Sequence, residues 1–380
     1  MPSLDHHGAP PIEAHSPTLS LILCSRNDNY MGNARWRLQT ALNYVARSVQ
    51  TLGRTADVEI LVTDWGSEIP LHEVLDLSPE AAGMTSFVVV PPATAKTLQR
   101  DSPFAEVIAL NAAARRATGT YIGRIDQDTL VGARFLKMFF EKFGKTAERD
   151  MPLAMGFSNV KMINYRFAVR CPSFASVEAY VRLFGRSLKR ENWHSRSPFY
   201  HAAVGIWLLH RTLWEECGGY DERMIYMNSM ETNMTRRLLP KYAMTNLGEL
   251  CDYDFYHLEH YHPWVPRLSR VYRKVNSHQE FATPDALNPN GDGWGLRDAQ
   301  VEVRRARAGH GPVDARSAGV AVLSFAVMML RIFPATAFDH VGLSARRQVQ
   351  RLRHAWQLIQ GHPVGAWPRV LVTRWKERRS

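Results

Sequence analysis

Short apolar runs alternate with longer segments in which apolar residues recur every three or four positions. The apolar runs cover residues 19–24, 58–62, 87–90 and 121–125, and each has the length of a strand. Residues 38–52 have the spacing of a helix that buries one face, and Gly53 follows where a left-handed residue commonly ends a helix. A second helix is predicted to open at Ser102 and to carry apolar residues through position 112. Strands that alternate with helices predict an α/β fold with parallel strands.

Polar segments directly follow three of these predicted strands. Ser25, Arg26 and Asn27 follow the first strand, Asp64 follows the second, and residues 126–128 follow the strand at 121–125. Open parallel sheets bind ligands where the carboxyl ends of their strands converge. We therefore expect the three polar segments to meet in one crevice.

Asp126 and Asp128 carry the most informative chemistry of the three segments. Two carboxylates one residue apart at the end of a strand can hold a divalent cation against an anionic ligand. The pair therefore predicts a metal site for a diphosphate, although acidic turns after strands are often only solvated.

The order and spacing of these segments over residues 17–300 resemble those of the family 2 glycosyltransferases with the GT-A fold. In that family the first loop and an acid of the second loop, here Asp64 in an Asp-Trp-Gly-Ser variant of Asp-Asp-Gly-Ser, hold the uridine of a nucleotide sugar. The Asp-x-Asp pair holds the metal and the ribose. The resemblance implies a GT-A (Rossmann-like) mixed sheet flanked by helices, with a donor site formed by Ser25, Arg26, Asn27, Asp64, Asn111, Arg124 and Asp126. For Asn111, a structural hydrogen bond to the strand is an equal alternative.

Glu231 is the candidate catalytic base. It lies in a segment that resembles the family's Gly-Gly-Tyr-Asp-Glu motif (residues 218–222) and the acidic helix start that follows that motif. Met230 and Asn233 stand where the family has carboxylates. A positioned base would deprotonate the acceptor hydroxyl. The alternative role of Glu231 is that of an acid that stabilises the first turn of a helix.

Three histidines at 257, 260 and 262 follow in a short aromatic segment. Imidazole beside carboxylates suits a borderline ion such as Mn²⁺ better than Mg²⁺, although Mg²⁺ stays possible. GT-A enzymes often take a ligand from a late histidine, and the resemblance favours His260, then His257, and His262 least. Hydrogen-bonded core histidines are the alternative.

Residues 288–296 are rich in Gly, Pro and Asn and predict an irregular loop. We expect a lid in which Trp294 closes on the donor and excludes water, or else an ordinary surface connection. Arginines between positions 166 and 196 are expected on the acceptor side, where they could bind an anionic acceptor or be merely solvated.

Positive charge gathers near the C-terminus. The net charge is +11, and residues 301–380 hold 14 Lys and Arg against 4 Asp and Glu. An uncharged run over residues 317–330 is too short to span a bilayer, and amphipathic spacing with flanking arginines and tryptophans follows it. Residues 317–380 therefore predict peripheral contact with an anionic membrane, or helices packed on the catalytic domain. No sequence signature of a nucleic-acid-binding domain accompanies the basic residues, so no nucleic-acid partner is expected.

These patterns predict three regions: a disordered lead-in over residues 1–17, a GT-A domain over 18–300 and a basic amphipathic helical region over 301–380. The four scattered cysteines favour reduced thiols, and no targeting peptide is recognised, so a cytoplasmic location is expected, with the inner face of the membrane as an option. The predicted function is metal-dependent, inverting transfer of a sugar from a UDP-sugar to a hydroxyl of a glycan or lipid-linked acceptor in surface polysaccharide synthesis. The alternatives are an inactive protein of the same fold that binds nucleotide, glycan or membrane, and a sugar nucleotidyltransferase, which the lack of glycines in the first loop disfavours.

Overall fold

The computed structural model describes residues 17–144, 153–190, 205–226, 229–260, 274, 276, 286–299 and 301–311. All of these lie in the first of the two units into which the chain divides, residues 1–321 and 322–380. Residues 1–16 of the expected lead-in, His262 and the expected membrane-contacting stretch 317–380 lie outside the described residues. No helix in the described ranges has the length and apolar character needed to cross a membrane.

The predicted α/β architecture is confirmed. Within the described residues the main sheet has eight strands, in the spatial order β11 (Glu302–Arg305), β3 (Thr85–Val90), β2 (Val58–Trp65), β1 (Leu19–Ser25), β4 (Tyr121–Arg124), β8 (Ile206–His210), β6 (Met155–Ser158) and β9 (Met244–Asn246). Strands β3, β2, β1 and β4 are parallel, whereas β8 and β11 are antiparallel to their neighbours. The sheet is therefore mixed, and the carboxyl ends of β1, β2 and β4 lie at one edge.

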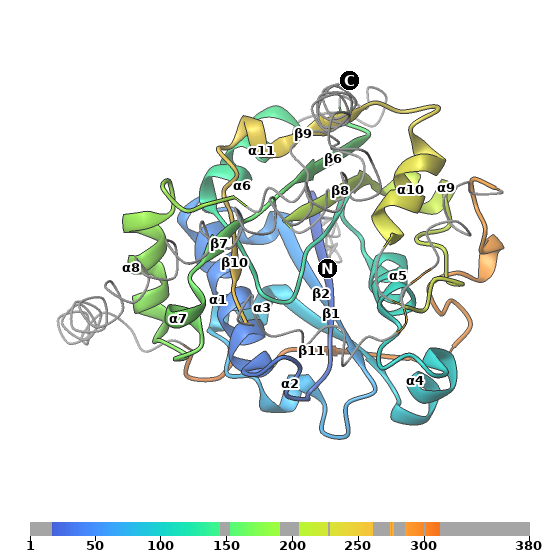
Figure 1. The fold of residues 1–380 in the computed structure, drawn as a ribbon, viewed down its shortest axis with the longest axis horizontal. Coiled ribbons are helices and arrows are strands. Elements are labelled where there is room, and N and C mark those ends of the chain that lie inside the picture. Colours follow the sequence, from blue (N-terminus) through green and yellow to red (C-terminus); the bar gives the residue numbers. More distant parts are fainter. Residues whose placement is uncertain are drawn as a thin grey trace, which may run out of the picture. The chain divides into compact units, whose positions relative to one another are not determined.

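Helices cover both faces of this sheet, and Figure 1 shows α1 and α5 on opposite sides of β1 and β2. The helices are α1 (Ala34–Thr51), α2 (Leu71–Val74), α3 (Pro79–Met84), α4 (Pro92–Gln99), α5 (Glu106–Arg116), α6 (Ala133–Lys142), α7 (Tyr165–Ala168), α8 (Phe174–Phe184), α9 (Arg211–Glu216), α10 (Met230–Leu238) and α11 (Leu247–Leu250), with short 3₁₀ turns at Thr55–Asp57 and Gly291–Gly293.

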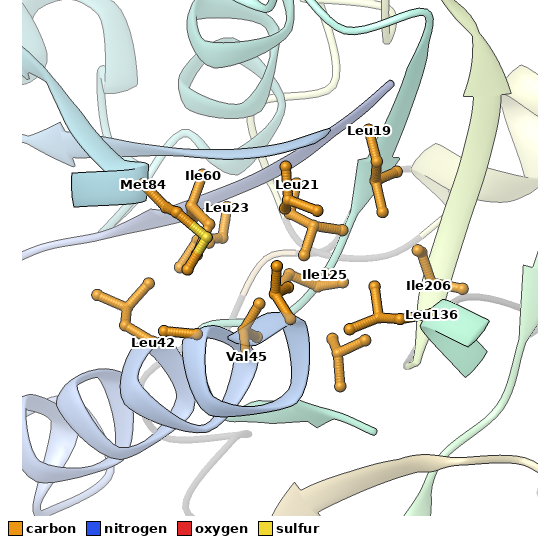
Figure 2. Close-up of a cluster of buried hydrophobic side chains, with 14 of the residues drawn as sticks. Leu19, Leu21, Leu23, Leu42, Val45, Ile60, Met84, Ile125, Leu136 and Ile206 are labelled. Atoms are coloured by element: carbon orange, nitrogen blue, oxygen red, sulfur yellow. The ribbon is translucent and has the colours of Figure 1, made fainter. Parts of the chain in front are cut away.

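The two-residue period of β1 divides its side chains between two cores. Leu19, Leu21 and Leu23 point to the face covered by α1, where they join the cluster shown in Figure 2. Ile22 points to the opposite face, in the cluster that contains the buried side of α5. Because both faces are covered, the strand reads as an almost continuous apolar run.

A second, smaller sheet of three strands within the described residues brings distant parts of the chain together. Its order is β5 (Thr129–Val131), β10 (Phe255–Leu258) and β7 (Lys161–Ile163), and β10 runs antiparallel to β5. The register sets His257 opposite Thr129, and the Leu258 amide donates to the Asp128 carbonyl over 3.0 Å. This pairing carries the histidine segment to the Asp-x-Asp pair.

The structure differs from the expected element boundaries at two places. The helix expected from Ser102 starts only at Glu106, because the Ser102 hydroxyl closes a local turn on the backbone of Phe104. Strand β11 pairs with β3 within residues 301–311, which we expected to begin the helical C-terminal region. The expected end of the first helix is confirmed, since Gly53 has a φ of 65°.

Candidate active site

The three polar segments at the ends of β1, β2 and β4 meet as predicted. The Ser25 hydroxyl donates to Oε1 of Gln127 over 2.5 Å, which joins the first segment to the third. The backbone N–H of Asn27 donates to Oγ of Ser67 over 2.8 Å, and its side-chain amide donates to the Ile69 carbonyl over 2.9 Å. The first segment is thereby bonded to both of its neighbours.

Asp64 is fully buried, and both of its carboxylate oxygens accept hydrogen bonds from the residues that follow it. The Ser67 hydroxyl donates to its Oδ1, and the Leu71 N–H donates to its Oδ2 over 2.7 Å. Burial raises the pKa of Asp64, and these hydrogen bonds only partly oppose the shift. Because the chain itself occupies both oxygens, Asp64 shapes the loop over residues 66–71.

Arg26 is half-buried beside Asp28 and Phe104. Its guanidinium pairs with Asp28 over 2.7 Å, lies 5.6 Å from the ring centroid of Phe104 and donates to the Pro103 carbonyl. The side chain is therefore held between the first segment and the turn that precedes α5.

Asp128 and two histidines, the buried His257 and the half-buried His260, form a group at the end of β4. Nδ1 of His257 lies 3.1 Å from Oδ1 of Asp128, and Nε2 of His260 lies 3.4 Å from Oδ2. One ligand atom from each residue lies within 4.8 Å of the other two. Arg37 from α1 reaches the same carboxylate and forms an ion pair with Oδ2.

Opposing effects fix the protonation states in this group. Burial alone would raise the pKa of Asp128, but His257, Arg37 and His260 outweigh it and lower the pKa well below its usual range. Asp128 likewise outweighs burial at His257 and raises the pKa of that imidazole to about 9. Burial lowers the pKa of His260 to about 3 and keeps that imidazole neutral. The carboxylate and one imidazole therefore already have the forms that metal binding requires.

The donor set fits a divalent cation. One carboxylate and two imidazoles suit borderline ions, Mn²⁺ among them. Nδ1 of His257 is buried and lies 3.1 Å from Oδ1 of Asp128 without a well-formed hydrogen bond among the described residues, so this imidazole could bind a cation once it has lost its proton. Asp128, His257 and His260 can thus hold a metal ion.

Asp126 belongs to a different group, centred on the buried guanidinium of Arg124. Nη2 of Arg124 lies 2.6 Å from Oδ1 of Asp126 and 2.9 Å from Oε1 of Glu106. Nη1 of Arg124 lies 3.6 Å from Oε1 of Glu231. The predicted base Glu231 and the first acid of the pair, Asp126, therefore share the Arg124 guanidinium. Asp126 does not belong to the Asp128–His257–His260 group.

Three carboxylates surround the single guanidinium of Arg124, so the group has an excess of negative charge. Burial raises the pKa of Asp126 to about 7, with Asp128 and Glu106 adding to the shift and Arg124 opposing it. Burial likewise raises the pKa of Glu231, which Arg124 lowers and Glu106 raises further. A carboxylate with a raised pKa accepts a proton more readily, as a general base should.

The side chains of Asn111 and Trp294, expected at the donor, both contact other parts of the chain. The Asn111 side chain donates to the carbonyl of Tyr220 and to Glu222, and accepts from the Tyr220 N–H over 2.8 Å. It therefore fixes residues 219–222, a structural role like the alternative considered, but with that segment and not the strand as partner.

Trp294 is only 2 % exposed and packs in the same core as α5, with Arg115 4.9 Å from its ring centroid. It lines a cavity of about 440 Å³ with Ile122, Arg211 and Trp214. Because the Glu222 carboxylate accepts from the Gly295 N–H, and Arg116 donates to the carbonyls of Gly295 and Leu296, this part of the loop is fastened to the domain. The expected closing of Trp294 on the donor does not fit this position.

Two residues of these groups were missed from the sequence. Arg37 falls three positions after Ala34 and four before Ala41, within the apolar stripe of α1. A charged residue in such a stripe signals a buried partner and could have been noticed. Glu106 in the first turn of α5 gives no such signal, because first-turn acids are common on solvated helices.

No family model matches the chain, and no curated protein is detectably similar to it. Among solved structures, the 1–349 fragment of S. aureus TarS has 13% identity and a TM-score of 0.37, and the match covers 57% of this chain and 53% of that one. The same fragment in complex with UDP has 13% identity and a TM-score of 0.36 over 58% and 54% of the two chains. The catalytic domain of Drosophila β1,4-galactosyltransferase 7 in complex with xylobiose has 12% identity and a TM-score of 0.35 over 71% and 83%.

The match thus spans about half the length of these TarS fragments. At such identities and TM-scores the likeness identifies no family.

Proposed function

We propose that this chain is a metal-dependent glycosyltransferase that moves a sugar from a UDP-sugar to a hydroxyl of a glycan or lipid-linked acceptor. The observation that carries the proposal is the meeting, at the carboxyl ends of parallel strands, of the Asp128–His257–His260 set with a half-buried carboxylate, Glu231, on the neighbouring Arg124 group. One group suits a cation and its diphosphate, and the other suits a proton acceptor.

The donor is assigned to the crevice formed by residues 25–27 and the loop over 66–71. Asp128, His257 and His260 would hold the cation, with Mn²⁺ preferred to Mg²⁺. Such a cation, when bound, neutralises the charge that develops on the leaving diphosphate. Asp64 would act on the donor indirectly, by holding the loop over residues 66–71 in place. Asp126 lies two residues before the proposed metal ligand Asp128.

Glu231 is assigned as the base. Its Oε1 is buried, lies 3.6 Å from Nη1 of Arg124 and accepts no well-formed hydrogen bond among the described residues, which leaves lone pairs for a proton. The acceptor hydroxyl would give its proton to this carboxylate while its oxygen bonds to the anomeric carbon. The bond from that carbon to the diphosphate breaks, and UDP leaves with the electron pair. A direct displacement of this kind inverts the anomeric configuration.

The acceptor is assigned to the side of the site near α7 and α8. The backbone there is bonded to the start of α1, since Asn33 donates to the Val169 carbonyl and Trp36 to the Pro172 carbonyl. Arg170, Arg182 and Arg186 are exposed in this part of the chain. They favour an anionic acceptor, such as a lipid-linked diphosphate or an acidic glycan, at the inner face of a membrane.

A calorimetric titration of UDP into the protein with Mn²⁺, with Mg²⁺ and with EDTA tests the proposal. We expect metal-dependent binding that is strongest with Mn²⁺. No UDP binding under any condition would overturn the assignment. Metal-dependent binding without turnover of any UDP-sugar would instead favour an inactive nucleotide-binding protein, whose sequence signal is the departure at Met230 and Asn233.

Product stereochemistry is tested separately. The NMR coupling constant of the anomeric proton in the product, compared with that in the donor, is expected to report inversion. Retention of configuration would contradict the role of Glu231 as a base in a direct displacement.

A further inference from the structure

We infer that Arg37 is a positioning residue that fixes the Asp128 carboxylate for the cation and ties it to the donor-binding segment after β1. The inference rests on the proposed function of the Asp128–His257–His260 set. It concerns a residue that contacts neither donor nor acceptor in the proposal. Its contacts differ from those of an ordinary core ion pair.

Each nitrogen of the Arg37 guanidinium has a separate task. Nη1 donates to Oδ2 of Asp128, Nη2 donates to the Tyr30 carbonyl over 2.5 Å, and Nε donates to the Gly32 carbonyl over 3.3 Å. The residue is 1 % exposed, and within the described ranges Asp128 is the carboxylate that pairs with it. A planar guanidinium can hold three acceptors in fixed directions, whereas a lysine ammonium cannot reproduce that fork.

The backbone that Arg37 holds is strained. Met31, Gly32 and Asn33 have φ values of 55°, 79° and 56°, a run in the left-handed region that two side-chain-bearing residues rarely adopt. Such a run persists only when neighbouring contacts impose it. Arg37 supplies two of those contacts, and the Asn29 side chain supplies another by accepting from the Asn33 N–H.

The segment held in this way borders the candidate metal ligands. The ring of Tyr30 lies 6.2 Å from that of His260, centroid to centroid, and the guanidinium carbon of Arg37 lies 6.0 Å from the Tyr30 centroid. Residues 25–27, assigned to the donor, directly precede this segment. Arg37 therefore connects the orientation of Asp128 with the shape of the donor loop through one buried side chain.

Two roles for such an arginine predict opposite effects on the cation. If Arg37 competes with the metal ion for the Asp128 carboxylate, its removal would strengthen metal binding. If Arg37 positions that carboxylate, its removal would weaken metal binding, because a ligating carboxylate needs its own hydrogen-bond partner, and loss of such partners costs about 10–100-fold in metal affinity. The fork of contacts to Asp128, Tyr30 and Gly32 favours positioning.

The test compares Arg37→Met and Arg37→Lys with Arg116→Met. Arg116 is a matched control, because its guanidinium also holds backbone carbonyls, those of Gly295 and Leu296, and lies outside both buried groups. Mn²⁺ affinity is measured by electron paramagnetic resonance without nucleotide, and amide hydrogen exchange is followed over residues 26–33. Thermal unfolding of each variant shows that it is folded.

We expect Arg37→Met to weaken Mn²⁺ binding by about 10–100-fold and to speed exchange over residues 26–33. Arg37→Lys should recover neither the wild-type Mn²⁺ affinity nor the slow exchange in full, because lysine keeps the charge but cannot make the three directed hydrogen bonds of the guanidinium. Arg116→Met should bind Mn²⁺ like the wild type. If Arg37→Met does not fold, Arg37→Lys decides by the same two measurements.

Unchanged or tighter Mn²⁺ binding by a folded Arg37 variant would overturn the inference and leave the proposed function standing. Full restoration by lysine would also overturn it. Absence of Mn²⁺ binding by the wild type would overturn the proposed metal site as well.

Discussion

The two buried groups at the end of β4 are opposites in charge. On one side, a single carboxylate, Asp128, faces a guanidinium and two imidazoles. On the other side, a single guanidinium, Arg124, faces three carboxylates, those of Glu106, Asp126 and Glu231. The pKa of Asp128 is lowered and that of Asp126 is raised, although the two residues are separated by one position. Desolvation raises the pKa of both residues, so the neighbouring charges account for the difference in direction.

This contrast teaches that an Asp-x-Asp pair is not necessarily one site with two equivalent ligands. Side chains at alternate positions could both turn into one cleft, yet here one binds the histidine group and the other binds Arg124. The first group is suited to stay ionised and hold a cation. The second is suited to take up a proton. The following changes test that division.

The largest effect is expected from Asp128→Asn compared with Asp126→Asn. The first change removes a metal ligand and should weaken Mn²⁺ binding by more than about 100-fold, beyond the loss expected for a neighbour of a ligand. Because it strands the buried Arg37, it should also lower the free energy of unfolding by about 3–5 kcal/mol. Asp126→Asn should keep most of the Mn²⁺ affinity. Electron paramagnetic resonance measures binding, and equal losses in both variants would abolish the contrast.

Glu231→Gln should lower turnover by about 10²–10⁴-fold while UDP binding stays unchanged. The amide keeps the size of the side chain but cannot accept the acceptor's proton. Steady-state rates and UDP calorimetry on the same preparation measure the two quantities. A parallel loss of UDP binding and turnover would assign Glu231 to the helix start and not to catalysis.

Asn111→Ala tests whether Asn111 has a structural role or a role in donor binding. The change leaves the backbone N–H of Tyr220 without its partner, whereas the Tyr220 carbonyl still accepts from Asn290, so we expect a loss of stability of about 1–3 kcal/mol. Urea unfolding measures this loss. UDP affinity should not change, whereas weaker UDP binding at unchanged stability would return Asn111 to the donor site.

The smallest effect is expected from Glu106→Gln on the pH dependence of turnover. Glu231 must be deprotonated to act, so its raised pKa sets an acidic limb at a higher pH than an ordinary glutamate would give. The groups facing it are Arg124, Glu106 and the Tyr220 hydroxyl. Glu106 raises the pKa of Glu231 by like charge, and its removal should move the limb to lower pH.

A pH profile of kcat/KM measures the position of this limb. Glu222→Gln is the control, because Glu222 binds Asn111 and Gly295 rather than Arg124, and the limb should stay in place. A shift to higher pH in Glu106→Gln would show that the Arg124 group does not set the proton affinity of Glu231.

The strands and helices that form the sheet and its cover could be predicted from the local sequence pattern. Apolar runs and helical spacing predicted β1 to β4 with α1 and α5, because each element carries its own period and must bury the face so defined. Residues 25–27, Asp64 and the Asp-x-Asp pair were placed at one edge, because the carboxyl ends of parallel strands share that edge. Helix starts were less certain, as at Ser102, where one side-chain hydrogen bond closes a turn before the helix begins.

Contacts between segments that are distant in the sequence determine which side chains share a buried group. The pairing of β10 with β5 brings His257 and His260 to Asp128 across more than a hundred residues, and no local pattern encodes that register. The division of Asp126 from Asp128, the role of Arg37 and the burial of Trp294 follow from contacts between distant segments. Local spacing fixes the faces of helices and strands, whereas the charges around a buried carboxylate come from elements that meet only in the folded chain.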